Sequence, residues 1–235
     1  MAWWSRLALP LLAALPLLAQ SGEEILARVD RLRHPWPAFR VELTVQDGKA
    51  SQRWLVSARE NGDARLDGLS EKEKGRAVLM LGDQMWLLLP GSKRPLKVTP
   101  QQRMMGSAAG GDVARTRFRK DYTVQGLNED LLDDRPCWRL DLAARTPGLS
   151  ARTVRLWVAK ERLLPLKAEF LLASGKVAHA ALFGPPVQAL GQAVLSWMRL
   201  AEPGGALVEL AFSDWSKGGV EASLFELPEA APGVR

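Results

Sequence analysis

Short stretches in which apolar and polar residues alternate follow one another along most of the chain, each closed by turn-forming residues. The residues from Phe39 to Val45 show this alternation, and the pair Asp47-Gly48 then supplies a hairpin turn. About eleven to thirteen such strands can be counted up to Trp215. They do not alternate with helices as a parallel sheet would require. The sequence therefore predicts a mainly β protein of antiparallel strands, in the form of a sandwich or a barrel.

The first residues have the pattern of a secretory signal peptide. Arg6 precedes an apolar run from Leu7 to Leu18, and Ala19 is a suitable last residue before cleavage. An uncleaved membrane anchor is the alternative, but the run of about twelve residues is short for a bilayer span of roughly 20. No cysteine follows the run to carry a lipid. We therefore expect residues 1–19 to be removed, and residues 20–235 to form a single soluble domain.

A short amphipathic helix is expected after the signal. Apolar residues recur at helical spacing between Glu23 and Leu32, with acidic residues in the first turn and arginines near the end. This charge order suits the helix dipole. The sequence HPWP at 34–37 then ends the helix, because proline disfavours helical backbone at and before its own position. We expect this helix to cap one end of the β structure.

The segment from Pro100 to Lys120 contains a loop that an ordinary β core does not require. Met104 and Met105 stand beside a run of small residues from Gly106 to Gly111, and a basic tail follows. Methionine adapts its shape to whatever it touches. The Gly-Gly pair permits hinge-like backbone angles. These features predict a movable lid over an apolar cavity.

Several blocks of the chain resemble the LolA-like periplasmic lipoprotein carriers, a family of bacterial outer-membrane lipoprotein-sorting proteins. They occur in the family's order: GDQMWLLLP, RMMGSAAGGDVARTRF, DYTV, DRPCWRLDLAAR, TVRLWVAKERLLPLKAEF and LVELAFSDW. Together they cover most of the chain after Phe39. The resemblance implies a half-open antiparallel β-barrel of about 11 strands capped by short α-helices. It also implies a periplasmic location, and we expect a monomer.

The function implied by this resemblance is the shielding of acyl chains, of a lipid or of a lipoprotein, in transit to the outer membrane. By the same resemblance, cargo would arrive from an ATP-driven inner-membrane transporter complex and leave to an outer-membrane acceptor. No residue of the sequence names either partner.

Tryptophan is abundant and tyrosine almost absent, with nine and one residues. Six of the tryptophans stand in predicted strands, where they either fill the core or line a cavity. A half-open barrel of about eleven strands is too wide for its own side chains to fill, which favours a cavity. Which face of each strand points inward stays undetermined, because a shift of one residue reverses the two faces. The expected cavity and lid residues are Trp54, Val56, Trp86, Leu88, Met104, Met105, Trp157 and Phe170.

The sequence lacks the residue clusters that enzymes and metal sites commonly need. It has two histidines, His34 and His179, and a single cysteine, Cys137, all of which we expect to be structural. The G-x-S-x-G and phosphate-loop motifs are missing. The net charge of +6 comes from arginines spread among acids, without the dense basic stripe of a nucleic-acid binder. We predict no enzymatic activity, no metal, no cofactor and no nucleic-acid partner.

Three alternatives remain open at this point. The chain could be an accessory of a lipid exporter that carries free lipids in place of lipoproteins. It could be a LolA-like sensor module that binds a membrane-bound regulator, although such sensors usually carry an additional domain. A hydrolase is the third alternative, and the missing nucleophile motif argues against it.

Overall fold

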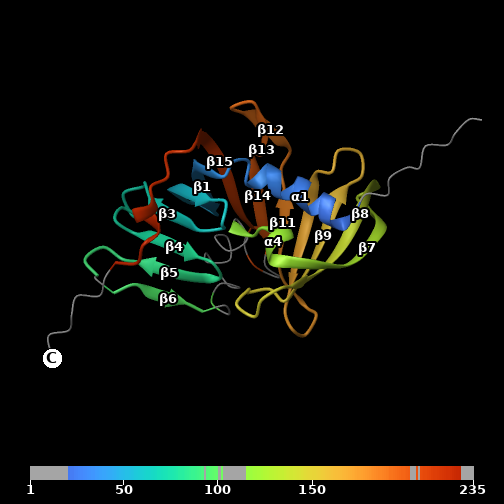
Figure 1. The fold of residues 1–235 in the computed structure, drawn as a ribbon, viewed down its shortest axis with the longest axis horizontal. Helices are drawn as coiled ribbons and strands as arrows, with labels where there is room; N and C mark the ends of the chain where they lie inside the picture. Colours follow the sequence, from blue (N-terminus) through green and yellow to red (C-terminus); the bar gives the residue numbers. More distant parts are fainter. Residues whose placement is uncertain are drawn as a thin grey trace, which may run out of the picture.

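One large antiparallel sheet dominates the fold (Figure 1). A computed structural model describes residues 21–92, 94–99, 102, 115–201, 205 and 207–228. Within these residues the sheet has thirteen strands and does not close on itself. The prediction of a mainly β, half-open antiparallel barrel is confirmed, and the strand number lies at the upper end of the eleven to thirteen counted in the sequence. The expected signal peptide, residues 1–19, and the lid residues Met104 and Met105 lie outside the described residues.

The strands follow the order β6-β5-β4-β3-β2-β1-β15-β14-β11-β10-β9-β8-β7 along the sheet. Most neighbours in the sheet are also consecutive in the chain, as expected for strands joined by short turns. In the middle, β1 pairs with β15 and so joins the first strand to the last. The bounds are β1 Ala38–Asp47, β2 Ala50–Arg59, β3 Ala64–Gly68, β4 Ala77–Leu81, β5 Gln84–Leu88, β6 Leu96–Val98, β7 Tyr122–Leu132, β8 Arg135–Ala144, β9 Thr153–Ala159, β10 Pro165–Leu171, β11 Val177–Phe183, β14 Trp197–Ala201 and β15 Leu207–Lys217.

A separate two-stranded hairpin interrupts the large sheet between β11 and β14. Its strands are β12 (Pro186–Ala189) and β13 (Gln192–Leu195), and it projects at the top of Figure 1. The sequence pattern predicts one continuous strand over residues 193–200, and this prediction is wrong. The chain leaves strand geometry at Ser196, whose hydroxyl donates a hydrogen bond to the Pro185 carbonyl oxygen at 2.6 Å. That contact ties the base of the hairpin together.

The helix α1 (Gly22–Arg33) confirms the amphipathic pattern read from the sequence. The Ser21 side chain accepts a hydrogen bond from the Glu24 backbone N–H, and the Glu24 side chain accepts one from the Ser21 N–H, which forms a capping box. Two further helical segments of the described residues are short: α4 (Phe118–Asp121) and the 3-10 turn η1 (Ala222–Phe225), which contacts β3 and β4. Among the described residues, no helix combines the length and apolar character that crossing a membrane requires.

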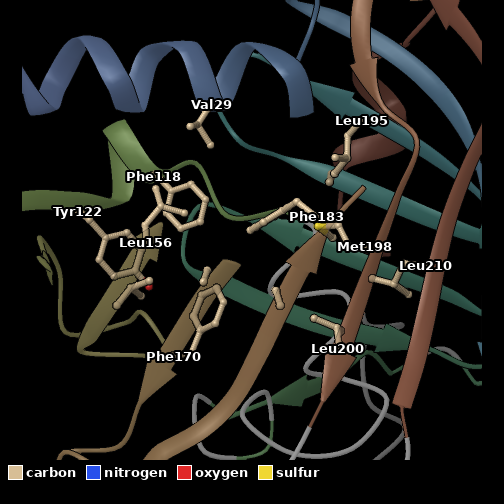
Figure 2. Close-up of a cluster of buried hydrophobic side chains, with 14 of the residues drawn as sticks. Val29, Phe118, Tyr122, Leu156, Phe170, Phe183, Leu195, Met198, Leu200 and Leu210 are labelled. Atoms are coloured by element: carbon tan, nitrogen blue, oxygen red, sulfur yellow. The ribbon is translucent and has the colours of Figure 1, made fainter. Parts of the chain in front are cut away.

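The helix α1 covers the inner face of one half of the sheet. Figure 2 shows Val29 of α1 above Phe118 and Tyr122, with Leu156 and Phe170 of the sheet beneath them. Each of these five side chains is 2% exposed or less. Large rings therefore fill the space between the helix and strands β7 to β11. We call this the packed half of the molecule.

Candidate functional site

An apolar cavity lies on the inner face of the other half of the sheet, where β1 to β4 face the end of α1 and strands β13 to β15. It encloses about 640 Å³ of empty space when the part open to solvent is counted, whereas about 50 Å³ admits the centre of a water molecule. The closed part is thus narrow, with room for only a few waters. We call this region, β1 to β4 with the cavity, the hollow half.

The strand register explains both the apolar walls and the empty space. Phe39, Ala58, Ala64 and Met80 lie opposite one another on successive strands from β1 to β4, so their side chains share one face. All four line the cavity. The two alanines are neighbours in the middle of this row, and a methyl group leaves unfilled the volume that a leucine or a ring would occupy. The cavity therefore follows from small residues at inward positions.

Two basic side chains from the end of α1 border the cavity. Arg33 is buried and donates a hydrogen bond to the Thr116 carbonyl oxygen at 2.7 Å. Burial lowers the pKa of Arg33 to about 10, so it stays charged at neutral pH. Burial, together with the charges of Arg117 and Arg33, lowers the pKa of His34 well below its usual value. His34 is therefore a neutral group of the wall and Arg33 a charged one.

Two further arginines fasten the chain before α4 to turns of the hollow half. Arg115 donates a hydrogen bond to the Gly82 carbonyl oxygen at 3.0 Å, in the turn between β4 and β5. Arg117 donates to the carbonyl oxygens of Arg59, at 2.9 Å, and of Glu60, in the turn between β2 and β3. Both arginines line the cavity. They belong to the last part of the segment, residues 100–120, in which the sequence predicts a lid.

Asp30 of α1 joins the same segment to the packed half. Its carboxylate accepts hydrogen bonds from the backbone N–H groups of Phe118 and Arg119, each at 2.9 Å. Burial raises the pKa of Asp30 to about 6, and the two N–H groups and the Arg33 charge offset this only in part. The contact between α1 and α4 therefore depends on pH.

The arrangement is suited to holding an apolar ligand without a covalent bond. The walls are aliphatic and aromatic, and the bordering arginines Arg33, Arg115 and Arg117 donate to backbone carbonyl oxygens. Across the described ranges, no group of three or more His, Cys, Asp or Glu side chains could hold a metal ion.

The structure places three of the predicted cavity residues on the inner face of the sheet. Val56 lines the cavity itself. Trp54 is opposite Leu43, another lining residue, and shares its face. Phe170 belongs to the packed cluster of Figure 2 and is 2% exposed. Their contact with a ligand stays a prediction.

The other described candidates lie on the opposite face of the sheet. Met85 is opposite the cavity residue Met80, so Trp86 and Leu88, at odd steps along the strand, point the other way. Trp157 follows the buried Leu156, and its indole N–H donates to Asp130 at 3.0 Å on the outer side. Met104 and Met105 lie outside the described residues. The sheet therefore gathers Trp54 and Val56 near one cavity but not the rest.

Sequence reasoning missed the arginines of the cavity. The basic tail at Arg115 and Arg117 is visible in the sequence, but its partners are carbonyl oxygens in distant turns. In the sequence, Arg33 is visible only as a basic residue that suits the dipole at the end of a helix. A basic residue buried beside an apolar wall has no signal of its own in a single sequence.

Solved structures of LolA-like proteins share this fold. A LolA superfamily protein from Nitrosomonas europaea is 25% identical, with a TM-score of 0.77 over 88% of this chain and 98% of that chain. A putative outer membrane lipoprotein-sorting protein domain from Vibrio parahaemolyticus is 18% identical, with a TM-score of 0.66 over 87% and 95%. A DUF1329 family protein from Desulfovibrio piger is 17% identical, with a TM-score of 0.69 over the same shares of the two chains, 87% and 95%.

Comparisons of the sequence itself add a family. A comparison with curated proteins found no match. A family model with the description "-like: Uncharacterized protein" matches residues 69–197, which is more than half of the chain. The chain therefore belongs to the family that this model describes, and its fold is similar to that of the LolA superfamily, as the resemblance of its sequence blocks predicts.

Proposed function

We propose that the protein is a periplasmic carrier that binds lipid acyl chains and takes part in sorting lipoproteins to the outer membrane. The observation that carries this proposal is the apolar cavity on the inner face of β1 to β4. The similarity of the fold to a LolA superfamily protein supports it. The function is binding and transfer, not catalysis.

The free energy of acyl-chain burial is sufficient for such a carrier. Each CH₂ group taken out of water contributes roughly 0.8 kcal/mol, so a long acyl chain gains on the order of 10 kcal/mol before the costs of ordering. A non-covalent carrier can therefore hold its cargo during transit. It must also release that cargo, which favours a pliable wall and a cavity that is not perfectly filled.

The cavity must widen to take a whole acyl chain, since its closed part has room for only a few water molecules. We assign this opening to the lid, with Met104 and Met105. Arg115 and Arg117 would hold the end of the lid segment against the turns that contain Gly82 and Glu60. Trp54 and Val56 would then form part of the wall that the acyl chain touches.

Location and partners complete the proposal. Residues 1–19 would direct export and be removed, and the mature chain would act as a monomer in the periplasm. It would receive cargo from an inner-membrane transporter complex and deliver it to an outer-membrane acceptor.

Extraction of lipid from natively purified protein tests the cargo. Mass spectrometry should find lipoproteins, or acyl chains in the proportions of lipoprotein anchors, bound to the purified chain. Free lipids alone would favour an accessory of a lipid exporter. A chain purified without detergent that carries no lipid, and takes up none when it is offered, would contradict the function.

A double substitution, Met104→Ser with Met105→Ser, tests the lid. It removes two adaptable apolar side chains and should weaken acyl-chain binding and slow transfer to acceptor vesicles. The pair Ser107→Ala and Ala108→Ser, in the same segment, is the matched control. Unchanged affinity and transfer in the methionine variant would exclude a lid role for these residues.

A further inference from the structure

The β12–β13 hairpin exposes aliphatic side chains within a stretch of chain that has no charged residue. The fifteen residues from Gly184 to Met198, GPPVQALGQAVLSWM, contain no charged side chain. Val187 is 45% exposed and Leu190 is 62% exposed. In Figure 1 the hairpin projects beyond α1 and away from the large sheet. Leu190 thus stands at the end of an uncharged projection, and Val187 is exposed nearer to its base.

The turn at the tip holds a leucine in a backbone conformation that leucine disfavours. Leu190 has φ 47° and Gly191 has φ 79°, so both central residues of this two-residue turn are in the left-handed region. Such turns are usually built from Asn-Gly or Asp-Gly. A branched, apolar residue is uncommon there, and neither burial nor turn chemistry accounts for it. Strain of this kind points to a function for the side chain.

The base of the same hairpin belongs to the cavity. Leu195, on β13, and Met198, just after it, line the cavity and are 3% and 0% exposed. Strand β13 also contacts α1. Leu195 is five positions after Leu190, a separation that spans at most roughly 17 Å along the chain. An object bound at the tip would therefore lie close to one wall of the cavity.

We propose that the tip of this hairpin inserts into the apolar part of a lipid bilayer, with Leu190 at the turn leading and Val187, three residues before it on β12, following, and so brings the cavity next to the membrane. Two side chains are far fewer than the roughly 20–30 residues a side of a stable protein interface. The absence of charge leaves nothing for a partner protein to match by ion pairs. An aliphatic tip on an uncharged stalk suits hydrocarbon. The purpose of this membrane contact rests on the proposed function, whereas the experiment that tests the contact does not.

Flotation with vesicles of phosphatidylcholine alone measures this insertion, because neutral vesicles do not attract a basic protein by charge. The full chain, purified as the cell processes it, should float with the vesicles, and about 0.5 M salt should not release it. Leu190→Asn creates the Asn-Gly turn that the backbone favours, so the hairpin should keep or improve its stability. The variant should bind the vesicles about 10-fold more weakly.

Leu131→Asn is the matched control, since Leu131 is 64% exposed but lies on β7, at the far edge of the sheet. It should bind vesicles like the unchanged chain. Equal vesicle binding by Leu190→Asn and the unchanged chain would overturn the inference. Binding that requires anionic lipid and is lost in salt would also overturn it. The same holds if Leu190→Asn keeps its binding to vesicles and loses only the binding of a partner protein.

A second readout separates this inference from the proposed function. Binding of a fluorescent fatty acid in the absence of vesicles should be the same for Leu190→Asn and the unchanged chain, because Leu190 does not line the cavity. If no fatty acid binds and the tip still inserts, the carrier function fails and the membrane contact stands. If fatty acid binds and the tip does not insert, only the membrane contact fails.

Discussion

The packed half and the hollow half of the molecule use one sheet in two different ways. Under α1, strands β7 to β11 are covered by rings, and Phe118, Tyr122 and Phe170 are almost completely buried. On β1 to β4 the same inward positions carry Ala58 and Ala64, and a cavity remains. Ala168 and Ala181 are neighbours on β10 and β11 in the packed half and are 0% exposed, so the rings that cover the strands, and not the size of the strand side chains alone, decide which half is filled.

This difference separates stability from binding. A cavity removes dispersion contacts from the residues that line it, so a protein that keeps one needs its stability elsewhere. The packed half contributes to it with a capped helix over the buried rings of Phe118, Tyr122 and Phe170. The hollow half can then remain open to a ligand without unfolding the molecule.

The largest expected effect compares a leucine from each half. Leu156→Ala, fully buried in the packed half, should lower the free energy of unfolding by about 3–5 kcal/mol. Leu66→Ala, 8% exposed on the cavity wall, should lower it by about 2 kcal/mol because fewer atoms surround it. Urea unfolding measures both. Equal losses would show that the two halves are packed alike.

A pH-dependent effect is expected at the junction of the halves. Burial raises the pKa of Asp30 from its ordinary 3.8 to about 6, so the folded chain binds this proton more tightly than the unfolded chain does. The stabilisation is complete below about pH 4 and is lost as the pH rises through about 6, by on the order of 1–3 kcal/mol.

Asp30→Asn isolates this contribution, since asparagine does not titrate. Relative to the variant, the unchanged chain should lose stability between about pH 4 and pH 6. His34 acts in the opposite direction in both proteins, because its pKa is lowered and its charging on acidification opposes folding. The difference between the two unfolding curves cancels it. Curves that remain parallel across this range would contradict the role of Asp30.

A smaller effect is expected where the lid segment meets the hollow half. Arg117→Gln removes charge-assisted hydrogen bonds to the carbonyl oxygens of Arg59 and Glu60, which should lower stability by about 1 kcal/mol and speed the uptake of a fluorescent fatty acid. Arg119→Gln is the control, since its ion pair with Glu23 is exposed. Stopped-flow fluorescence gives the uptake rates. Identical uptake rates in both variants would show that Arg117 does not hold the lid segment against the hollow half.

The sequence was sufficient for the strands but not for their faces or their distant partners. Alternation from Phe39 to Val45 predicts β1 because burial on one side imposes a period of two. The outward direction of Trp86 and Trp157 could not be predicted, since a shift of one residue reverses the face on which a side chain lies. The break at Ser196 depends on a hydrogen bond across the hairpin base. These contacts are set by tertiary structure, which local patterns do not encode.

The apolar nature of the candidate site could be predicted from the sequence, but only some of the residues that form it could. The abundance of Trp and the width of a barrel of about eleven strands favoured an apolar cavity, and Val56 does line one. The alanines that leave the space empty, Ala58 and Ala64, are unremarkable in a strand pattern. A cavity is the space that the surrounding side chains leave empty, and a single sequence does not show which side chains surround a common space.

Titration with a fluorescent long-chain fatty acid tests the central claim most directly, with Ala58→Leu as the decisive variant. The added atoms fill the cavity at the middle of its wall, so the affinity should fall at least about 10-fold while stability is kept. Ala180→Leu, next to the fully buried Ala181 but on the other face of β11, should bind like the unchanged chain. Equal affinity in all three proteins would contradict binding in this cavity.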